Sequence, residues 1–189
     1  MSSAQLVGES TNPIVGLHVY DRGDFTDRGQ ISLANMSTAN FPAQLREGWV
    51  NIISKASGKC LDVIGGSTGP GAGIQQWDCT GADNQKFRFT PVQGGYEITA
   101  KNSGLQLDVT GGPSAVQDGV RIQQFPYWGG SNEVWQVTPG FDGNYSIIAT
   151  HSNKCLDVEA PSSSLNGANV QQWTCWGADN QSWRVSRAR

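Results

Sequence analysis

The sequence is poor in charged residues and has no long apolar run. Of its 189 residues, 15% are charged, which is well below the usual quarter, and the net charge is −3. No basic run is longer than a pair, so the electrostatic footprint of a nucleic-acid-binding surface is missing. No apolar stretch approaches the roughly 18 residues of a membrane-spanning helix. We therefore expect neither a nucleic-acid partner nor a membrane span.

Metal-binding and secretory patterns are also missing. The four cysteines include no Cys-x-x-Cys pair, and the two histidines, His18 and His151, lie far apart in the chain. This spacing is not typical of a zinc site, and we expect no metal and no cofactor. The N-terminus has no basic start followed by an apolar stretch, so it does not look like a secretory signal.

A unit of three short motifs occurs three times after residue 48. The motifs are GKCLDV (58–63), GIQQWDC (73–79) and DNQKF (83–87), then GLQLDV (104–109), RIQQFPY (121–127) and SNEVW (131–135), then NKCLDV (153–158), NVQQWTC (169–175) and DNQSW (179–183). In every copy the Asn of the third motif follows the aromatic of the second by seven residues. We therefore divide the chain into an N-terminal extension or hairpin (1–48) and three repeats at about 49–93, 94–141 and 142–189.

Each repeat is predicted to consist of β-strands. No segment keeps a 3.6-residue apolar period over three turns, and the 24 glycines favour turns and short strands. Each copy opens on a strand-like segment, at 49–54, 96–100 and 145–150, and about four short strands per copy are expected. One copy could not bury its apolar face alone, whereas three could close around a shared core.

The cysteines fall in pairs within the first and third repeats. The pairs are Cys60 with Cys79 and Cys155 with Cys175, and the second repeat has Gln106 and Tyr127 at these positions. Because both partners are missing together, this pairing is favoured among the three possible connectivities. Such disulfides indicate an oxidising, extracellular compartment. Four reduced cysteines in the core are the alternative.

These motifs resemble the ricin-type lectin family, which includes the family-13 carbohydrate-binding modules of bacterial glycosidases. The resemblance covers residues 49 to about 187, with the cysteine pairs, the CLDV segment and a Gln-x-Trp signature at 85–87 and 181–183. The first copy has Phe87 in place of the Trp, and the second has Glu133 in place of the Gln. The resemblance implies an all-β fold, the β-trefoil, in which a six-stranded barrel is capped by three hairpins with pseudo-threefold symmetry.

The resemblance also implies a sugar site in each repeat. A sugar needs a flat apolar surface for its C–H face, and fixed donors and acceptors for its hydroxyls. A carboxylate is a strong acceptor, and an amide both donates and accepts. Carried over from the family, the carbohydrate-binding residues are Asp62, Gln75, Trp77 and Asn84, then Asp157, Gln171, Trp173 and Asn180, then, in the diverged second copy, Asp108, Gln123, Phe125 and Asn132.

Other repeated residues are assigned to packing or support. Phe87, Trp135 and Trp183 match the core aromatics of the family, and we expect them to be buried. Gln85 and Gln181 precede these aromatics closely, and we expect them to orient the Asp or the Asn from behind.

The second copy is the most diverged. It has Phe125 instead of Trp and Glu133 behind Asn132, so it is either a weaker site or a repeat kept only for the fold. Trp128 and Trp176 occupy equivalent positions, three residues beyond the stacking aromatic. One hypothesis is that each widens its site for another sugar unit, and the alternative is that each folds over its hairpin.

Together these features favour a non-catalytic, multivalent lectin or polysaccharide-targeting module for galactose-type or plant and microbial glycans. An accessory module of a secreted glycosidase and a protein-binding trefoil are the alternatives. Catalysis by this chain is not expected, because glycoside hydrolysis needs two carboxylates close together and the recurrent Asp occurs once per repeat. The chain is nevertheless compatible with being part of a larger glycoside hydrolase.

Overall fold

The computed structural model describes residues 47–140 and 142–188. Nearly all of the N-terminal extension expected over 1–48 lies outside the described residues. The strands are β1 (Val50–Ser54), β2 (Cys60–Val63), β3 (Ile74–Trp77), β4 (Phe87–Val92), β5 (Gly95–Ala100), β6 (Gln106–Val109), β7 (Ile122–Phe125), β8 (Trp135–Pro139), β9 (Tyr145–Ala149), β10 (Lys154–Val158), β11 (Val170–Trp173) and β12 (Trp183–Arg187). Short 3-10 turns form η1 (Ile64–Gly66), η2 (Asp83–Gln85), η3 (Ser131–Glu133) and η4 (Asp179–Gln181). No helix in this described part is long and apolar enough to cross a membrane.

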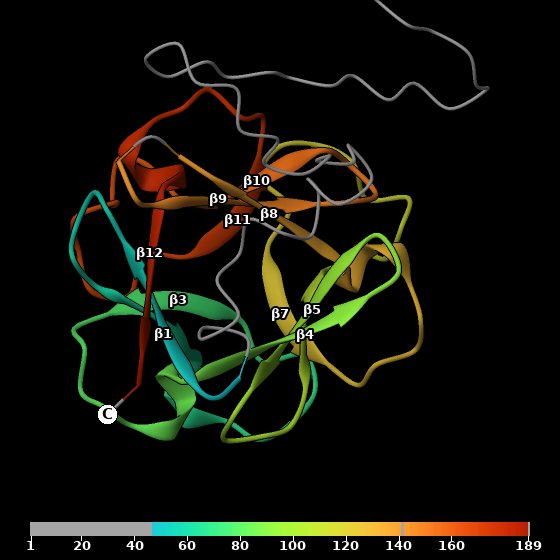
Figure 1. Cartoon of the computed structure of the whole chain (residues 1–189), viewed down its shortest axis with the longest axis horizontal. Helices are drawn as coiled ribbons and strands as arrows, with labels where there is room; N and C mark the ends of the chain where they lie inside the picture. Colours follow the sequence, from blue (N-terminus) through green and yellow to red (C-terminus); the bar gives the residue numbers. More distant parts are fainter. Residues whose placement is uncertain (1–46, 141, 189) are drawn as a thin grey trace, which may run out of the picture. The chain divides into compact units, whose positions relative to one another are not determined.

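Six strands close into a barrel and the other six form hairpins. Antiparallel pairing runs from β1 to β4, β5, β8, β9 and β12 and then returns to β1. The hairpins are β2–β3, β6–β7 and β10–β11, and isolated bridges join each hairpin to the other two. A closed six-stranded barrel with three such hairpins is a β-trefoil, which confirms the fold class (Figure 1).

Each repeat gives the shared core the same apolar residues. The equivalent buried residues in the hairpins are Leu61, Leu107 and Leu156, then Val63, Val109 and Val158, then Ile74, Ile122 and Val170. The aromatics Phe87, Trp135 and Trp183 are 0% exposed, which confirms that they are core residues. The indole N–H groups of the two tryptophans donate to hairpin carbonyls at 3.1 and 2.9 Å, so these polar groups are satisfied inside the core.

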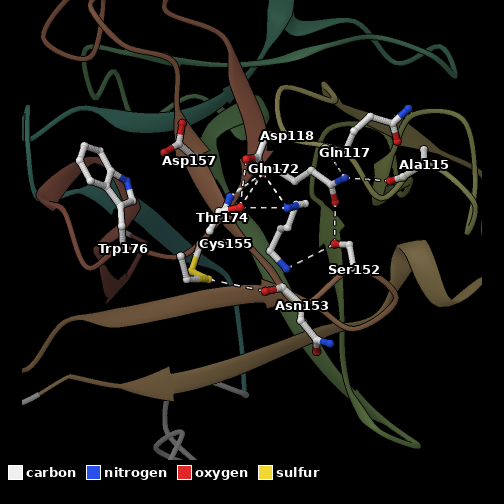
Figure 2. A network of polar contacts seen from close by, with 12 residues as sticks. Ala115, Gln117, Asp118, Ser152, Asn153, Cys155, Asp157, Gln172, Thr174 and Trp176 are labelled. Carbon is white, nitrogen blue, oxygen red and sulfur yellow. Dashed lines mark hydrogen bonds and ion pairs between the residues drawn. A yellow bond between two sulfur atoms is a disulfide. The ribbon is translucent and has the colours of Figure 1, made fainter.

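A buried glutamine in the third hairpin binds the loop of the second repeat. The side-chain amide of Gln172 donates to the carbonyls of Ala115 and Gln117 at 2.8 and 2.9 Å, and its Oε1 accepts from the Ser152 hydroxyl at 2.8 Å (Figure 2). The Gln172 side chain is 0% exposed. This one buried side chain therefore makes three hydrogen bonds, two of them to the loop of another repeat.

The same contact occurs in the other two hairpins and closes a cycle. Gln124 donates to the carbonyls of Ser67 and Gly69 in the first repeat, and Gln76 donates to those of Ser163 and Leu165 in the third. Each repeat therefore holds the loop of another. The residues that make this contact are visible in the sequence as the second Gln of each IQQW or IQQF motif and of VQQW, but the motif alone does not indicate their partners.

Both expected disulfides are present. Cys60 is bonded to Cys79 and Cys155 to Cys175, and no cysteine remains unpaired. Each bridge closes a loop of about 20 residues, which stabilises the fold by roughly 3 kcal/mol in the chain-entropy view. In the second repeat, Gln106 stands at the position of Cys60 and Cys155. Its side-chain oxygen accepts a hydrogen bond from the Thr99 hydroxyl at 2.9 Å.

We predict that Gln172→Leu lowers the free energy of unfolding by about 3 kcal/mol, because it removes three hydrogen bonds made by one fully buried side chain. Urea unfolding at neutral pH measures the change. Gln93→Leu, at an exposed turn, is the control and should change stability by less than about 0.5 kcal/mol. Equal stability of the two variants would contradict a role for the interlocked loops.

Candidate functional site

The third hairpin holds a buried carboxylate among amide donors. Asp157 lies on β10 and is 2% exposed. One of its oxygens accepts from Gln171 Nε2 at 2.9 Å, and the other accepts from Asn180 Nδ2 at 2.9 Å and from Gln181 Nε2 at 3.0 Å. Burial raises the pKa of Asp157, because the loss of water outweighs the help from these amides.

The first hairpin repeats this arrangement. The carboxylate of Asp62 accepts from Gln75 at 2.8 Å, from Asn84 at 2.9 Å and from Gln85 at 2.9 Å. The sequence-predicted Asp, Gln and Asn are therefore brought together, although they come from two strands and a 3-10 turn. Gln85 and Gln181 both support the Asp from behind, as expected.

A half-exposed aromatic lies beside each carboxylate. Trp77, Phe125 and Trp173 are 41%, 38% and 41% exposed. Each follows the bonded Gln by two residues in its strand, so both side chains lie on the same face of the hairpin. A glycine from another repeat approaches each tryptophan, since a Cβ built on Gly119 or Gly167 would lie 3.7 or 3.8 Å from the ring. The interlocked loops thus also support the aromatic faces.

The second site has the same Asp, Gln and Asn but differs behind them. Asp108 accepts from Gln123 at 2.7 Å and from Asn132 at 2.6 Å. Glu133, in place of the supporting Gln, is 0% exposed, and its Oε1 has no hydrogen-bond partner. Burial raises the pKa of Asp108, and the pKa of Glu133 is raised by burial and then by the charge of Asp108.

Trp128 lies in the second site. It lines a hollow of about 250 Å³ together with Asp108, Phe125 and Asn132. Asn132 is 0% exposed, and a Cβ on Gly130 would collide with both Asn132 and the Trp128 ring. The ring therefore lines the hollow and also lies close to the site's amide.

Trp176, the equivalent residue in the third repeat, is more exposed. Its side chain is 69% exposed, and Figure 2 shows its ring clear of the polar network around Thr174. Its backbone N–H donates to Gln181 Oε1 at 3.0 Å, which ties this segment to the glutamine that supports Asp157. The two tryptophans thus differ, although the sequence aligns them.

Comparison with known proteins identifies relatives of this domain. The family model described as "Ricin-type beta-trefoil lectin domain" matches residues 48–183. Among curated proteins, a β-agarase of Agarivorans albus, AgaB34, is 42% identical over 60 residues, which are 31% of this chain and 13% of that enzyme. The chain thus corresponds to a small part of the enzyme.

Solved structures extend the comparison. ThreeFoil, a designed threefold-symmetric protein, is 40% identical with a TM-score of 0.70, over 74% of this chain and 98% of that one. An exo-β-1,3-galactanase of Clostridium thermocellum is 34% identical with a TM-score of 0.70, over 75% of this chain and 30% of that one. An earthworm R-type lectin half in complex with GalNAc is 26% identical with a TM-score of 0.58, over 74% and 98%.

We predict that Gly130→Ala displaces the Trp128 ring, because the added Cβ cannot share its space. In a ¹H–¹⁵N spectrum the Trp128 indole signal should shift more than those of the other tryptophans. Gly69→Ala is the control, since its Cβ would meet only an ordinary contact, at 3.7 Å. An unmoved Trp128 signal in Gly130→Ala would show that the ring does not occupy this place in solution.

Proposed function

Because the chain belongs to the ricin-type β-trefoil lectin family, we propose that it binds glycans without catalysing a reaction. The observation that carries this proposal is the pairing of a half-exposed tryptophan with a buried, amide-bonded aspartate. This pairing occurs in the first and third hairpins, at Trp77 with Asp62 and Trp173 with Asp157. It combines the two features that sugar recognition needs, a flat apolar face and a fixed acceptor.

In the proposed complex the C–H face of a pyranose ring stacks on the tryptophan, and its hydroxyls donate to the aspartate. Gln171, Asn180 and Gln181 already hold the Asp157 carboxylate in place. The carboxylate therefore loses little conformational freedom on binding. Its remaining lone pairs accept from hydroxyls in charge-assisted hydrogen bonds. The half-buried Asn84 offers its carbonyl oxygen to a further hydroxyl in the first site.

Binding is multivalent, with the first and third hairpins as principal sites and the second as a diverged one. Each site lies on a different hairpin, so one molecule presents separate faces to a branched or repeating glycan. Such an arrangement raises avidity without strong binding at any one site.

The proposed ligands are galactose-type sugars or galactose-containing plant and microbial polysaccharides. Similarity to a galactanase and to a lectin bound to GalNAc supports this class. The chain matches 13% of an agarase and 30% of the galactanase, which supports a second proposal, a targeting module in a secreted glycosidase. The two disulfides support an extracellular location.

We predict that Trp173→Ala weakens binding at the third site by about tenfold or more, because the stacking face is removed. Calorimetric titration with lactose, after a glycan array, measures the loss. Trp49→Ala is the matched control, since Trp49 packs against Arg88 rather than in a hairpin site. If Trp173→Ala binds as many lactose molecules as the control, the site assignment is wrong.

We predict that the third site loses lactose on acidification. Protonated Asp157 no longer offers a charged acceptor, and its raised pKa means that this loss begins at a higher pH than for an ordinary aspartate at 3.8. Titration between pH 7 and pH 3, in Trp77→Ala/Phe125→Ala protein, isolates this site. Asp157→Asn should bind weakly at every pH. Unchanged binding down to pH 3 would exclude the carboxylate as an acceptor.

A further inference from the structure

Glu133 occupies the place of a residue with a defined task in the other two repeats. There, Gln85 and Gln181 each donate from Nε2 to Oδ2 of the site's aspartate, at 2.9 and 3.0 Å. Each also accepts, through Oε1, from the backbone N–H three residues beyond the stacking aromatic, at Thr80 and at Trp176. The same Nε2 also donates to a backbone carbonyl, of Asp78 or of Thr174, at 3.0 Å. The glutamine therefore uses its oxygen for a loop N–H, one N–H bond for the aspartate and the other for a loop carbonyl.

Glu133 repeats one half of this pattern and lacks the other. Its Oε2 accepts from the backbone N–H of Trp128, the residue equivalent to Thr80 and Trp176, and from that of Gly130, both at 3.2 Å. Oε2 thus replaces the glutamine oxygen. Oε1 then replaces the glutamine nitrogen, and it is the atom of this fully buried side chain that has no hydrogen-bond partner.

An ionised carboxyl would fit this place badly. The nitrogen position faces the aspartate, so an ionised Glu133 would set one buried carboxylate against another with no hydrogen between them. A protonated carboxyl has the same shape as the glutamine amide, and its single O–H can take the place of the N–H that bonds the aspartate.

We propose that Glu133 keeps its proton in the folded protein and donates it in a hydrogen bond from Oε1 to Asp108, so that a carboxylic acid positions the second site's aspartate. Asp108 is the better anion of the two, because amide donors reach both of its oxygens while Glu133 Oε1 receives none. The pair then carries one negative charge and keeps the geometry of the other two sites.

The other polar and charged groups around Glu133 and Asp108 do not overturn the argument for a protonated Glu133. Three backbone N–H groups, of residues 128 to 130, favour an ionised Glu133, yet burial and the charge of Asp108 raise its pKa. His151 favours the ionised form of Asp108. The pKa of Tyr127 is raised, first by the charge of Glu97, then by burial and to a smaller extent by the charge of Glu133.

The proton gives the second site an upper pH limit that the other two sites lack. As the pH rises through the pKa of Glu133, the O–H bond to Asp108 is lost and the two carboxylates repel each other. The glutamine amides of the first and third sites cannot ionise. This consequence for sugar binding rests on the proposed function, whereas the position of the proton does not.

The proton is tested without any sugar. The ¹³C signal of the Glu133 carboxyl, assigned by its disappearance in Glu133→Gln, should titrate well above the ordinary glutamate value of about 4.3. The stability that comes from a raised folded pKa is fully present below the unfolded value of about 4.3 and is lost as the pH rises through the folded pKa. Glu133→Gln should therefore gain Tm relative to the natural protein as the pH rises. Gln181→Glu is the matched variant, and it should acquire the same fall in Tm with rising pH.

A Glu133 signal that titrates at about 4.3, or parallel Tm curves for Glu133→Gln and the natural protein, overturns the proposal. Lactose binding then tests the functional consequence. In Trp77→Ala/Trp173→Ala protein, which keeps only the second site, affinity should fall at least tenfold as the pH rises through the titration of the Glu133 carboxyl signal, and adding Glu133→Gln should remove that fall. Absence of lactose binding at every pH would contradict the proposed function of this site, and the carboxyl signal would still decide where the proton is.

Discussion

The side-chain amides of Gln76, Gln124 and Gln172 bind loops that belong to other repeats, and together they close a cycle around the three hairpins. These glutamine side chains are fully buried, and each makes two hydrogen bonds to the backbone of the loop that it holds. The loops that they hold bring Gly119 and Gly167 against the tryptophans of neighbouring repeats. The first and third candidate sites therefore depend on the cycle, because a loop from another repeat lies against the tryptophan of each.

Each candidate site combines a buried charge with a half-exposed ring. The carboxylate tolerates burial because amides donate to both of its oxygens, and the same amides fix the direction of its remaining lone pairs. The ring stays partly exposed because it lies at the end of a short strand. In the second site the supporting amide is replaced by Glu133, and Trp128 lies close to the Asn. The three sites thus share one framework and differ in the residues around it.

Much of this arrangement could be predicted because equivalent positions can be compared between the three repeats. The joint loss of both cysteines in the second copy indicated which cysteines pair, and the disulfides Cys60–Cys79 and Cys155–Cys175 follow that pattern. The support of the aspartates by Gln85 and Gln181 was also expected. The role of Gln172 was not, because its partners are backbone carbonyls about 55 residues away in the sequence, and a carbonyl has no residue type to reveal it.

The sequence by itself determined the number of repeats, the strand-rich character of each, the cysteine pairing and the residue types of each site, because these follow from local pattern and from the spacing of equivalent positions. Only the tertiary structure decided which loop covers which hairpin, where Trp128 lies and which oxygen of Glu133 lacks a partner. These features depend on tertiary contacts. Trp128 and Trp176 show how far the alignment of the repeats can be used. They are equivalent in sequence, but their exposure differs because Gly130 leaves room for one ring beside Asn132.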